Sequence, residues 1–249
     1  APDMFEKLLH KADETGADVV GCDYNLVTSQ TMQVGSIVKN NSLDQTGQLT
    51  GEQYGKLILR SGSMVIKIYQ AQVIRSNQLN FPEYIFYEDN CAGPLWMLYF
   101  KHFEKVEEPL YYYYQHQTST VHTITKQRCK DRMSAASLFL SECRVRGFIE
   151  TYKDEIEYRY TELFYVNTLF SYVSGVKKQN LFQKISFLSE MKKEVSRQFP
   201  EFMKNPYYQT LVGQEEKKLI RFLGESTVLF LAYYTALKQY RKIRKSLQA

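Results

Sequence analysis

The spacing of apolar residues changes near residue 124, and this change restricts the fold more than any other feature of the sequence. Before it, short apolar runs of strand length alternate with short helical segments. After it, long segments with a period near 3.6 residues dominate. We therefore expect an α/β domain over residues 1–123, followed by an α-helical domain over residues 124–249.

Glycine, proline and capping patterns divide the first part into short elements. Gly16 ends a first helix, Thr50 and Gln53 form a capping box, and Pro109 indicates an edge strand or an irregular entry. We expect helices at 2–15, 50–59, 70–78 and 94–103, and strands at 17–27, 32–38, 64–69 and 106–114.

The second part consists of apolar-periodic segments that end at glycine or proline. Gly147, Gly175, Pro200 and Gly224 are the predicted stops. The expected helices cover residues 126–146, 148–174, 181–199, 215–222 and 226–247.

Composition excludes several classes of protein. The formal charge is only +5, from 32 basic and 27 acidic residues, and does not indicate a nucleic-acid partner. The four cysteines are scattered, which predicts reduced thiols in a cytoplasmic protein and argues against a disulfide framework or a zinc site. The most apolar run, residues 228–234, is far shorter than the roughly 20 residues of a membrane span.

Two adjacent carboxylates, Glu88 and Asp89, stand out as candidate catalytic residues. They close an aromatic segment and precede an apolar helix that contains Pro94. Asp89 or Asn90 is expected to cap this helix, with Pro94 in its first turn. The positive end of the helix dipole would favour the ionised carboxylate that a general base requires. An ordinary acidic cap explains the same pair equally simply.

Several segments together resemble bacterial family 2 glycosyltransferases of the GT-A fold. Residues 2–8 and 15–20 are similar to the segment that follows the Asp-x-Asp motif of that family. The resemblance covers about residues 2–122 and implies a partial GT-A-like fold with a mixed sheet, and the helical part would be a variable tail. The matching sequences are PDMFEKL (2–8), TGADVV (15–20), KIY (67–69), NFPE (80–83), YEDN (87–90) and LYYY (110–113), which runs on to Ser119 and Thr120.

This resemblance implies a reaction. In the family, the aspartate of the Glu-Asp pair removes a proton from the acceptor hydroxyl, whose oxygen displaces a nucleoside diphosphate with inversion. Asp89 would be that base, and Glu88 would orient the acceptor or the sugar. A divalent metal, Mg or Mn, would be held by the Asp-x-Asp motif and stabilise the leaving diphosphate.

The chain departs from the family pattern at the donor side. No Asp-x-Asp motif can be quoted from it, so we expect the C-terminal portion of an enzyme that is inactive alone and holds no metal alone. Gln115 stands where the family has an arginine. The resemblance suggests His116 as a metal or diphosphate contact, although a surface histidine is the simpler interpretation. Ser119 and Thr120 are expected near the acceptor or donor.

The Gln-x-x-Arg-Trp pattern of processive synthases is also missing from the sequence. Trp96 follows Pro94 and Leu95 and is expected in core or acceptor-side packing. We therefore expect a non-processive hexosyltransferase of cell-surface polysaccharide synthesis. Its substrates would be a nucleotide-sugar donor and a glycan or lipid-linked acceptor.

Two further hypotheses concern the helical part. Its aromatic residues favour, as an alternative function, a non-catalytic module that binds a partner helix. The last helix carries basic residues near its end, which predicts a peripheral contact with the anionic inner membrane face, or only a solvated helix end. A homo-oligomer is also expected from unpaired sheet edges. The aromatic residues are Tyr158, Phe164, Tyr165, Phe170 and Tyr172, and the basic residues are Lys238, Arg241, Lys242, Arg244 and Lys245.

Overall fold

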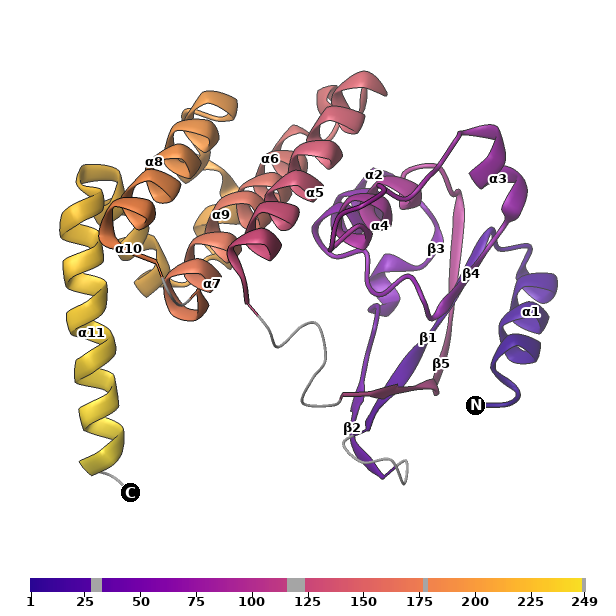
Figure 1. Ribbon diagram of the computed structural model, residues 1–249. Coiled ribbons are helices and arrows are strands. Elements are labelled where there is room, and N and C mark those ends of the chain that lie inside the picture. The colour runs from indigo at the N-terminus through magenta and orange to yellow at the C-terminus, as the bar shows by residue number, and fades with distance from the viewer. Residues whose placement is uncertain (28–32, 116–123, 177–178, 248–249) are drawn as a thin grey trace.

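The computed structural model describes residues 1–27, 33–115, 124–176 and 179–247. A sheet with helices on both faces forms the N-terminal side, and helices alone form the C-terminal side (Figure 1). This confirms the predicted class, an α/β part followed by helices. The elements of the α/β part are α1 (Met4–Thr15), β1 (Val19–Val27), β2 (Val34–Val38), η1 (Leu43–Gln45), β3 (Gly47–Gln48), α2 (Gly51–Leu59), β4 (Lys67–Tyr69), α3 (Ala71–Ser76), α4 (Asp89–Met97) and β5 (His102–Tyr114).

The sheet is mixed and is centred on β1. β1 runs parallel to β5 and antiparallel to β2 and β4, and the short β3 pairs with the start of β5. Cys22 pairs with Val106 but Asp23 pairs with Pro109, so two residues of β5 bulge out between them. The strand predicted at 106–114 starts earlier, at His102, so Pro109 follows a bulge inside the strand and not an irregular entry. The side chain of Asn25 donates a hydrogen bond to the Pro109 carbonyl at 2.7 Å.

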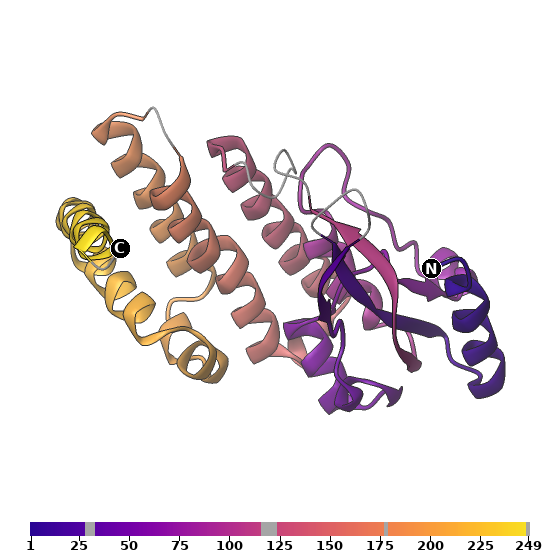
Figure 2. The same cartoon turned by 90° about the horizontal axis from the view of Figure 1, so that it is seen from below.

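Each face of the sheet buries its own set of apolar residues. Val20 and Cys22 face α1 and pack with Leu8. Val19 and Phe103 belong to the larger core on the other face, where α2 and α4 lie. This core continues into the C-terminal helices (Figure 2). The same apolar packing therefore covers the sheet and holds α4 against α5.

Short-range sequence signals in this part are largely confirmed. Gly16 ends α1 in a left-handed conformation, with φ of 70°, as the predicted stop requires. The capping box at the start of α2 is present, since the backbone N–H of Thr50 donates to the Gln53 side chain at 2.9 Å. The strand predicted at 64–69 is shorter, because only Lys67–Tyr69 pair with β1.

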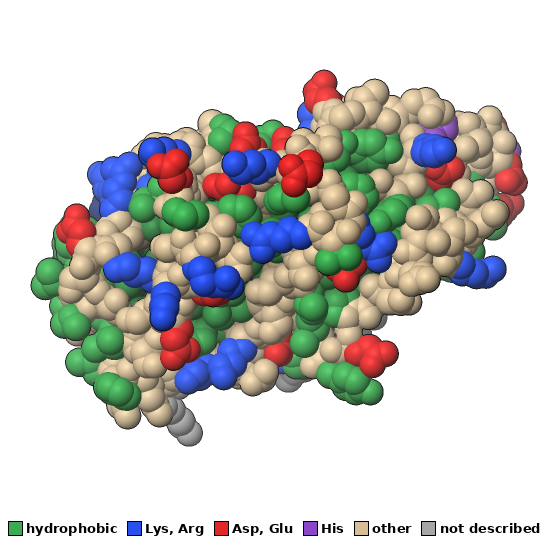
Figure 3. All heavy atoms as spheres, turned by 90° about the horizontal axis from the view of Figure 1, so that it is seen from above, with side chains coloured by type: hydrophobic (Ala, Val, Ile, Leu, Met, Phe, Trp, Pro, Cys, Tyr) green, Lys and Arg blue, Asp and Glu red, His purple; other side chains and the backbone are tan. Residues whose placement is uncertain are grey.

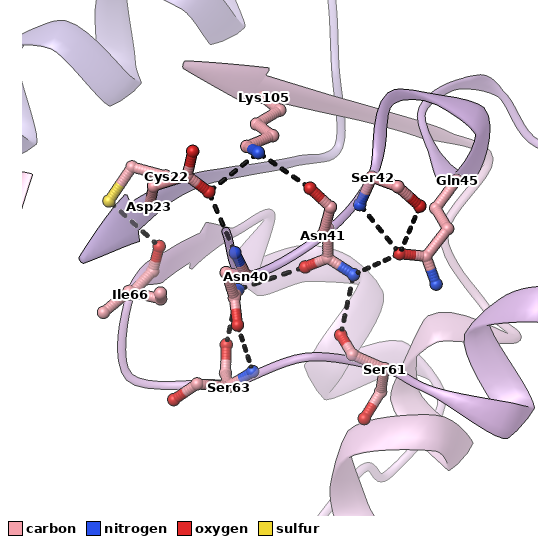
Figure 4. A network of polar contacts seen from close by, with 10 residues as sticks. All are labelled: Cys22, Asp23, Asn40, Asn41, Ser42, Gln45, Ser61, Ser63, Ile66 and Lys105. Atoms are coloured by element: carbon pink, nitrogen blue, oxygen red, sulfur yellow. Dashed lines mark hydrogen bonds and ion pairs between the residues drawn. The ribbon is translucent and has the colours of Figure 1, made fainter. Parts of the chain in front are cut away.

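The polar segment 40–45, between β2 and β3, takes part in a buried polar network (Figure 4). At its centre, Lys105 and Asp23 form an ion pair of 2.7 Å, and their side chains are 2% and 5% exposed. Asp23 also accepts the Asn40 N–H at 2.9 Å, and Lys105 donates to the Asn41 carbonyl at 2.7 Å. The Asn41 side chain donates to Gln45 and thereby connects η1 to the sheet. Buried charges of this kind need such hydrogen bonds to offset their lost hydration.

Lys67 is buried beside this network, and no carboxylate of the described residues pairs with it. Its ammonium donates to the carbonyls of Ser61 at 3.0 Å and Ser63 at 2.7 Å. Burial lowers the pKa of Lys67 to about 7, from an ordinary value of 10.5.

This shift predicts that Lys67 makes stability depend on pH. Above pH 7 the unfolded chain keeps the Lys67 proton and the folded chain releases it, so unfolding takes up a proton and becomes less favourable as pH rises. Between about pH 7 and 8, the contribution of Lys67 to the free energy of unfolding should rise by roughly 1 kcal/mol per pH unit. Urea unfolding of wild type and Lys67→Met measures it, because other titrating groups cancel in the difference. A difference that stays constant with pH contradicts the prediction.

The C-terminal side is built from helices packed on one another. α5 lies against α4 and α6, and α11 packs on α8 and α10. None of the described helices is long and apolar enough to cross a membrane. The elements are α5 (Lys126–Val145), η3 (Phe148–Glu150), α6 (Lys153–Thr161), η4 (Glu162–Asn167), α7 (Thr168–Gly175), α8 (Leu181–Gln198), η5 (Phe202–Lys204), α9 (Pro206–Leu211), α10 (Gln214–Glu225) and α11 (Thr227–Leu247).

Two predictions for this side were wrong. The single helix predicted at 148–174 is divided, because a short turn precedes α6 and η4 is a π-helical segment between α6 and α7. α9 was missed, although Asn205 and Pro206 are a typical helix start. The Asn205 side chain accepts the backbone N–H of Tyr207 at 2.9 Å, and Pro206 occupies the first position.

Candidate active site

Glu88 and Asp89 lie at the start of α4, the helix between the sheet and α5. Every residue of this helix from Cys91 to Met97 is buried, and the Asp89 side chain is exposed. The acidic pair is therefore held at the surface by a helix that is anchored in the core. This arrangement fixes the position of the carboxylates while leaving Asp89 open to solvent.

The predicted capping arrangement is wrong. α4 begins at Asp89, with Glu88 in the capping position and no side-chain cap hydrogen bond. Pro94 consequently lies inside the helix rather than in its first turn. The preceding turn replaces the cap, because the N–H of Asn90 bonds to the Tyr87 carbonyl at 3.0 Å.

The segment before the pair has an unusual backbone. Gln78, Tyr84 and Tyr87 have positive φ values of 51°, 60° and 67°. Residues other than glycine rarely adopt a positive φ, and those that do are often found at functional sites. Two arginines of α5, four residues apart, lie over aromatic rings of the segment. The Arg128 and Arg132 guanidinium groups lie 5.0 Å and 4.8 Å from the ring centres of Phe86 and Tyr87.

The electrostatic environment raises the pKa of Asp89 above its ordinary value of 3.8. The surrounding protein reduces the hydration of the carboxyl group, and the neighbouring Glu88 adds repulsion. The Asn90 N–H and Arg159 oppose this rise but do not outweigh it. The expectation that the helix terminus would make ionisation easier is therefore wrong. A carboxylate with a raised pKa is a better proton acceptor, which is what a general base requires.

A cavity of about 520 Å³ opens beside the pair. Tyr87 and Asn90, the residues on either side of Glu88 and Asp89, form part of its wall. The other walls come from the start of α5, from η4 and α7, and from α10. Its lining combines apolar, hydroxyl, amide and charged groups, as small-molecule sites commonly do. The lining residues are Tyr87, Asn90, Ile124, Arg132, Leu163, Asn167, Phe170, Ser171, Ser174 and Glu216.

Arg132 joins three walls of the cavity. Its guanidinium donates to the Ser171 hydroxyl at 2.9 Å and the Asn167 carbonyl at 3.2 Å. It also lies 3.4 Å from the Tyr87 hydroxyl, beneath the Tyr87 ring. This planar cation therefore holds the segment before Asp89 against α7.

The π-helical segment η4 contributes Leu163 and Asn167 to the lining. The Thr168 hydroxyl, which is fully buried, donates to the Leu163 carbonyl five residues earlier at 2.7 Å. This bond satisfies a carbonyl of the widened turn. Short π-helical segments inside α-helices occur frequently at functional sites.

Arg159, near the end of α6, bridges the pair to η4. It donates to the Asn90 side chain at 3.1 Å and to Glu162 at 2.9 Å, and the Asn90 amide lies 3.3 Å from an Asp89 oxygen. Its Nε is buried and has no hydrogen-bond partner among the described residues. The Arg159 guanidinium therefore contacts Asn90, the residue that follows the candidate base Asp89.

Of the other predicted site residues, the structure describes Trp96 alone. Trp96 is 6% exposed, and its ring lies 4.9 Å from Phe81 and 5.8 Å from Tyr69. Its role at the acceptor side stays a prediction. His116, Ser119 and Thr120 lie outside the described residues.

Within the described ranges there is no group of three or more His, Cys, Asp or Glu side chains placed to hold a metal ion. The described residues alone therefore do not make a site for the divalent metal that the resemblance implies. That metal stays a prediction.

Sequence reasoning missed Arg132, Arg159, Asn167 and Ser171. One signal was available, since the first two turns of α5 hold several basic residues and the first turn has no acid. Positive charge at a helix N-terminus is unfavourable to the helix dipole, so such residues need partners elsewhere. Nothing in the sequence indicates that Asn167 faces a cavity, because that follows from the π-helical turn.

Of three comparisons with known proteins, the one with solved structures bears on the fold. No family model matches the chain, and no curated protein matches its sequence. Among solved structures, the chain is similar to S. aureus TarS 1-349, with a TM-score of 0.54 and 14% identity. The match covers 96% of this chain and 63% of that one, so this chain spans less than two thirds of its length. At this identity the likeness shows the fold alone, which is glycosyltransferase-like.

Proposed function

We propose that this protein is an inverting, non-processive family 2 glycosyltransferase of the GT-A type. It would move a sugar from a nucleotide-sugar donor to a glycan or lipid-linked acceptor of the cell surface. The observation that carries the proposal is the position of Asp89, an accessible carboxylate with a raised pKa beside a cavity of about 520 Å³. The glycosyltransferase-like fold supports it, and the structural neighbour TarS is a wall teichoic acid glycosyltransferase.

In the proposed reaction, the acceptor occupies the cavity and presents a hydroxyl to Asp89. The Asp89 carboxylate takes the hydroxyl proton while the acceptor oxygen bonds to the anomeric carbon of the donor sugar. The bond between that carbon and the diphosphate oxygen breaks, and the nucleoside diphosphate leaves with the electron pair. Attack opposite to the leaving group inverts the anomeric configuration.

Other residues of the site would bind and orient the acceptor. The hydroxyl of Ser171 and the amide of Asn167 offer hydrogen bonds to sugar hydroxyls, and Phe170 offers an apolar surface. Arg132 joins the walls formed by η4 and α7 to Tyr87. Glu88, the second carboxylate, would orient the acceptor or the donor sugar.

The proposal is tested by assaying the natural full-length protein with a panel of nucleotide sugars and surface-glycan acceptors. Release of nucleoside diphosphate reports transfer, and NMR of the product gives the anomeric configuration. We expect transfer of a single sugar with inversion. A product with retained configuration, or with many added sugars, contradicts the corresponding part of the proposal.

Replacing Arg132 by Lys tests the acceptor site. Lysine keeps the charge but loses the planar stack on Tyr87 and the second guanidinium nitrogen, which reaches the Tyr87 hydroxyl. We expect KM for the acceptor to rise by about tenfold, with a smaller change in kcat. Arg128→Lys is the matched control, because Arg128 stacks on Phe86 in the same way but does not line the cavity. Equal effects of both variants would assign Arg132 a purely structural role.

The alternative function, a helical module for partner binding, is not favoured. Tyr158, Phe164, Tyr165 and Tyr172 are buried in the core of this chain, and none is more than 4% exposed. Phe170 is partly buried and lines the cavity. The aromatic stripe on which this alternative rests is therefore internal packing.

A further inference from the structure

Exposed side chains of mainly apolar type follow one face of α11 at alternating intervals of four and three residues. They are Leu229, Tyr233, Ala236, Tyr240 and Ile243, and the four large ones are 60%, 48%, 61% and 60% exposed. We call this set the α11 seam. Its mean spacing of 3.5 residues is that of the core positions of a coiled coil. A strip confined to these positions is narrower than the apolar face of a helix that packs into a globular core.

The protein's own core uses a different face of the helix. Phe230 and Leu231 are buried, and Tyr234 packs against them in the main core, where α11 contacts α8 and α10. The second half of α11 extends beyond these helices (Figure 1). Figure 3 looks onto the opposite end of the molecule from this projecting half, and it shows apolar side chains among lysines and arginines on the helical side. No described part of the chain covers the seam.

Tyr233, one residue of the α11 seam, is already ordered without a partner. The Tyr233 ring stacks on Phe222 of α10, with ring centres 5.2 Å apart and planes at 15°. Both rings line a hollow of about 290 Å³ between α10 and α11. A side chain ordered in this way loses less entropy when a partner covers it.

Charge is distributed unevenly along the helix. No charged residue occurs from Ser226 to Leu237, whereas Lys238, Arg241, Lys242 and Arg244 follow. Two such helices side by side in parallel would bring their basic halves together. In an antiparallel pair, each basic half lies beside an uncharged half, which removes most of the repulsion.

Side-chain size favours the same orientation. In a parallel pair, equivalent seam positions meet, so Tyr240 would face a tyrosine and Ala236 would face an alanine. In an antiparallel pair centred near residue 238, Ala236 meets Tyr240 of the second copy, and Tyr233 meets Ile243. Each large ring then lies opposite a smaller side chain, which fills space evenly.

We propose that the α11 seam is an interface with a second copy of this chain, in which the two α11 helices pair antiparallel. The interface is isologous, since each helix offers the same residues to the other. The projecting half of one helix lies along the anchored half of its partner.

An anionic membrane fits the helix less well. With 3.6 residues per turn, Lys238 and Lys242 lie on the side of α11 away from the seam. A helix is roughly 10–12 Å across, whereas charge is screened over about 8 Å at physiological salt. If the seam entered a membrane, these lysines would be largely screened from it.

Sedimentation velocity of the full chain over a wide concentration range tests the interface. We expect a reversible dimer in the wild type. The double variant Tyr240→Glu with Ile243→Glu should raise the dimer Kd at least about a hundredfold. The matched control, Lys238→Gln with Lys242→Gln, changes the other side of the helix and should leave the dimer intact. Both substituted pairs are exposed, and circular dichroism checks that the helix is kept.

Cysteine cross-linking tests the orientation, since the four native cysteines are buried. Mixing Ala236→Cys with Tyr240→Cys should give a cross-linked dimer, and either variant alone should give little. Strong cross-linking of one variant alone overturns the antiparallel arrangement. A wild-type protein that stays monomeric overturns the proposal. So does a dimer that the Tyr240→Glu, Ile243→Glu variant still forms with unchanged Kd. A monomer that binds phosphatidylglycerol vesicles, and loses binding with the glutamates, would assign the seam to a membrane instead.

Discussion

Replacing Asp89 by Asn lowers the rate of sugar transfer by about 100- to 10,000-fold, the usual effect of removing a general base. Asparagine has nearly the same shape and can still accept the contact with Asn90, so the fold and donor binding should be unchanged. The measurement is kcat for the natural full-length protein, with donor binding followed by calorimetry. A loss of less than about tenfold would count against Asp89 as the base.

Glu88→Gln is the matched control for this substitution. If it proves the more damaging of the two, the roles of the carboxylates must be exchanged. The pH profile provides a second readout. Because the pKa of Asp89 is raised above 3.8, kcat/KM in the wild type should fall on acidification at a higher pH than for an ordinary aspartate. The Asn variant should lack this transition.

Replacing Lys105 by Met should strongly destabilise the fold. The substitution leaves the Asp23 carboxylate buried, with the Asn40 N–H as its only partner among the described residues, and removes a donor from the Asn41 carbonyl. Breaking a buried ion pair in this way costs about 3–5 kcal/mol. Urea unfolding followed by circular dichroism measures the loss in the free energy of unfolding.

The control is Lys7→Met in α1. Lys7 pairs with Asp3 at 3.0 Å and Glu108 at 2.5 Å, but its side chain is 37% exposed. Solvent-exposed pairs contribute less than about 1 kcal/mol, so this variant should be nearly neutral. Adding Asp23→Asn to Lys105→Met should recover part of the loss, because no buried charge is then left unpaired. A Lys105→Met variant as stable as Lys7→Met would show that water reaches the network.

The sequence predicted the features that local physics controls. The period of apolar residues located α5, α8, α10 and α11 to within a few residues, because each helix must present one apolar face to the core. Gly16 and Gly147 mark helix ends because both adopt positive φ, which glycine tolerates. The acidic pair was also recognisable from the sequence, since it joins an aromatic segment to an apolar helix.

The candidate site was predictable only in part. Glu88 and Asp89 were identified, but Arg132 and Arg159 were not, because they reach the pair from helices 40 to 70 residues later in the chain. The direction of the Asp89 pKa shift was also misjudged. A helix terminus acts over one turn and is visible in the sequence, whereas the loss of hydration depends on everything packed around the carboxyl group.

The sequence by itself thus determined where helices and strands form and which residues carry acid chemistry. Only the tertiary structure decided how they meet. Nothing in the sequence connects Asp23 with Lys105, yet packing buries them together. Pro94 reads as a first-turn residue, yet the turn at Tyr87 starts the helix earlier. The reason is that local propensity amounts to tenths of a kcal/mol per residue, whereas burial and ion pairing amount to several and join residues that are distant in sequence.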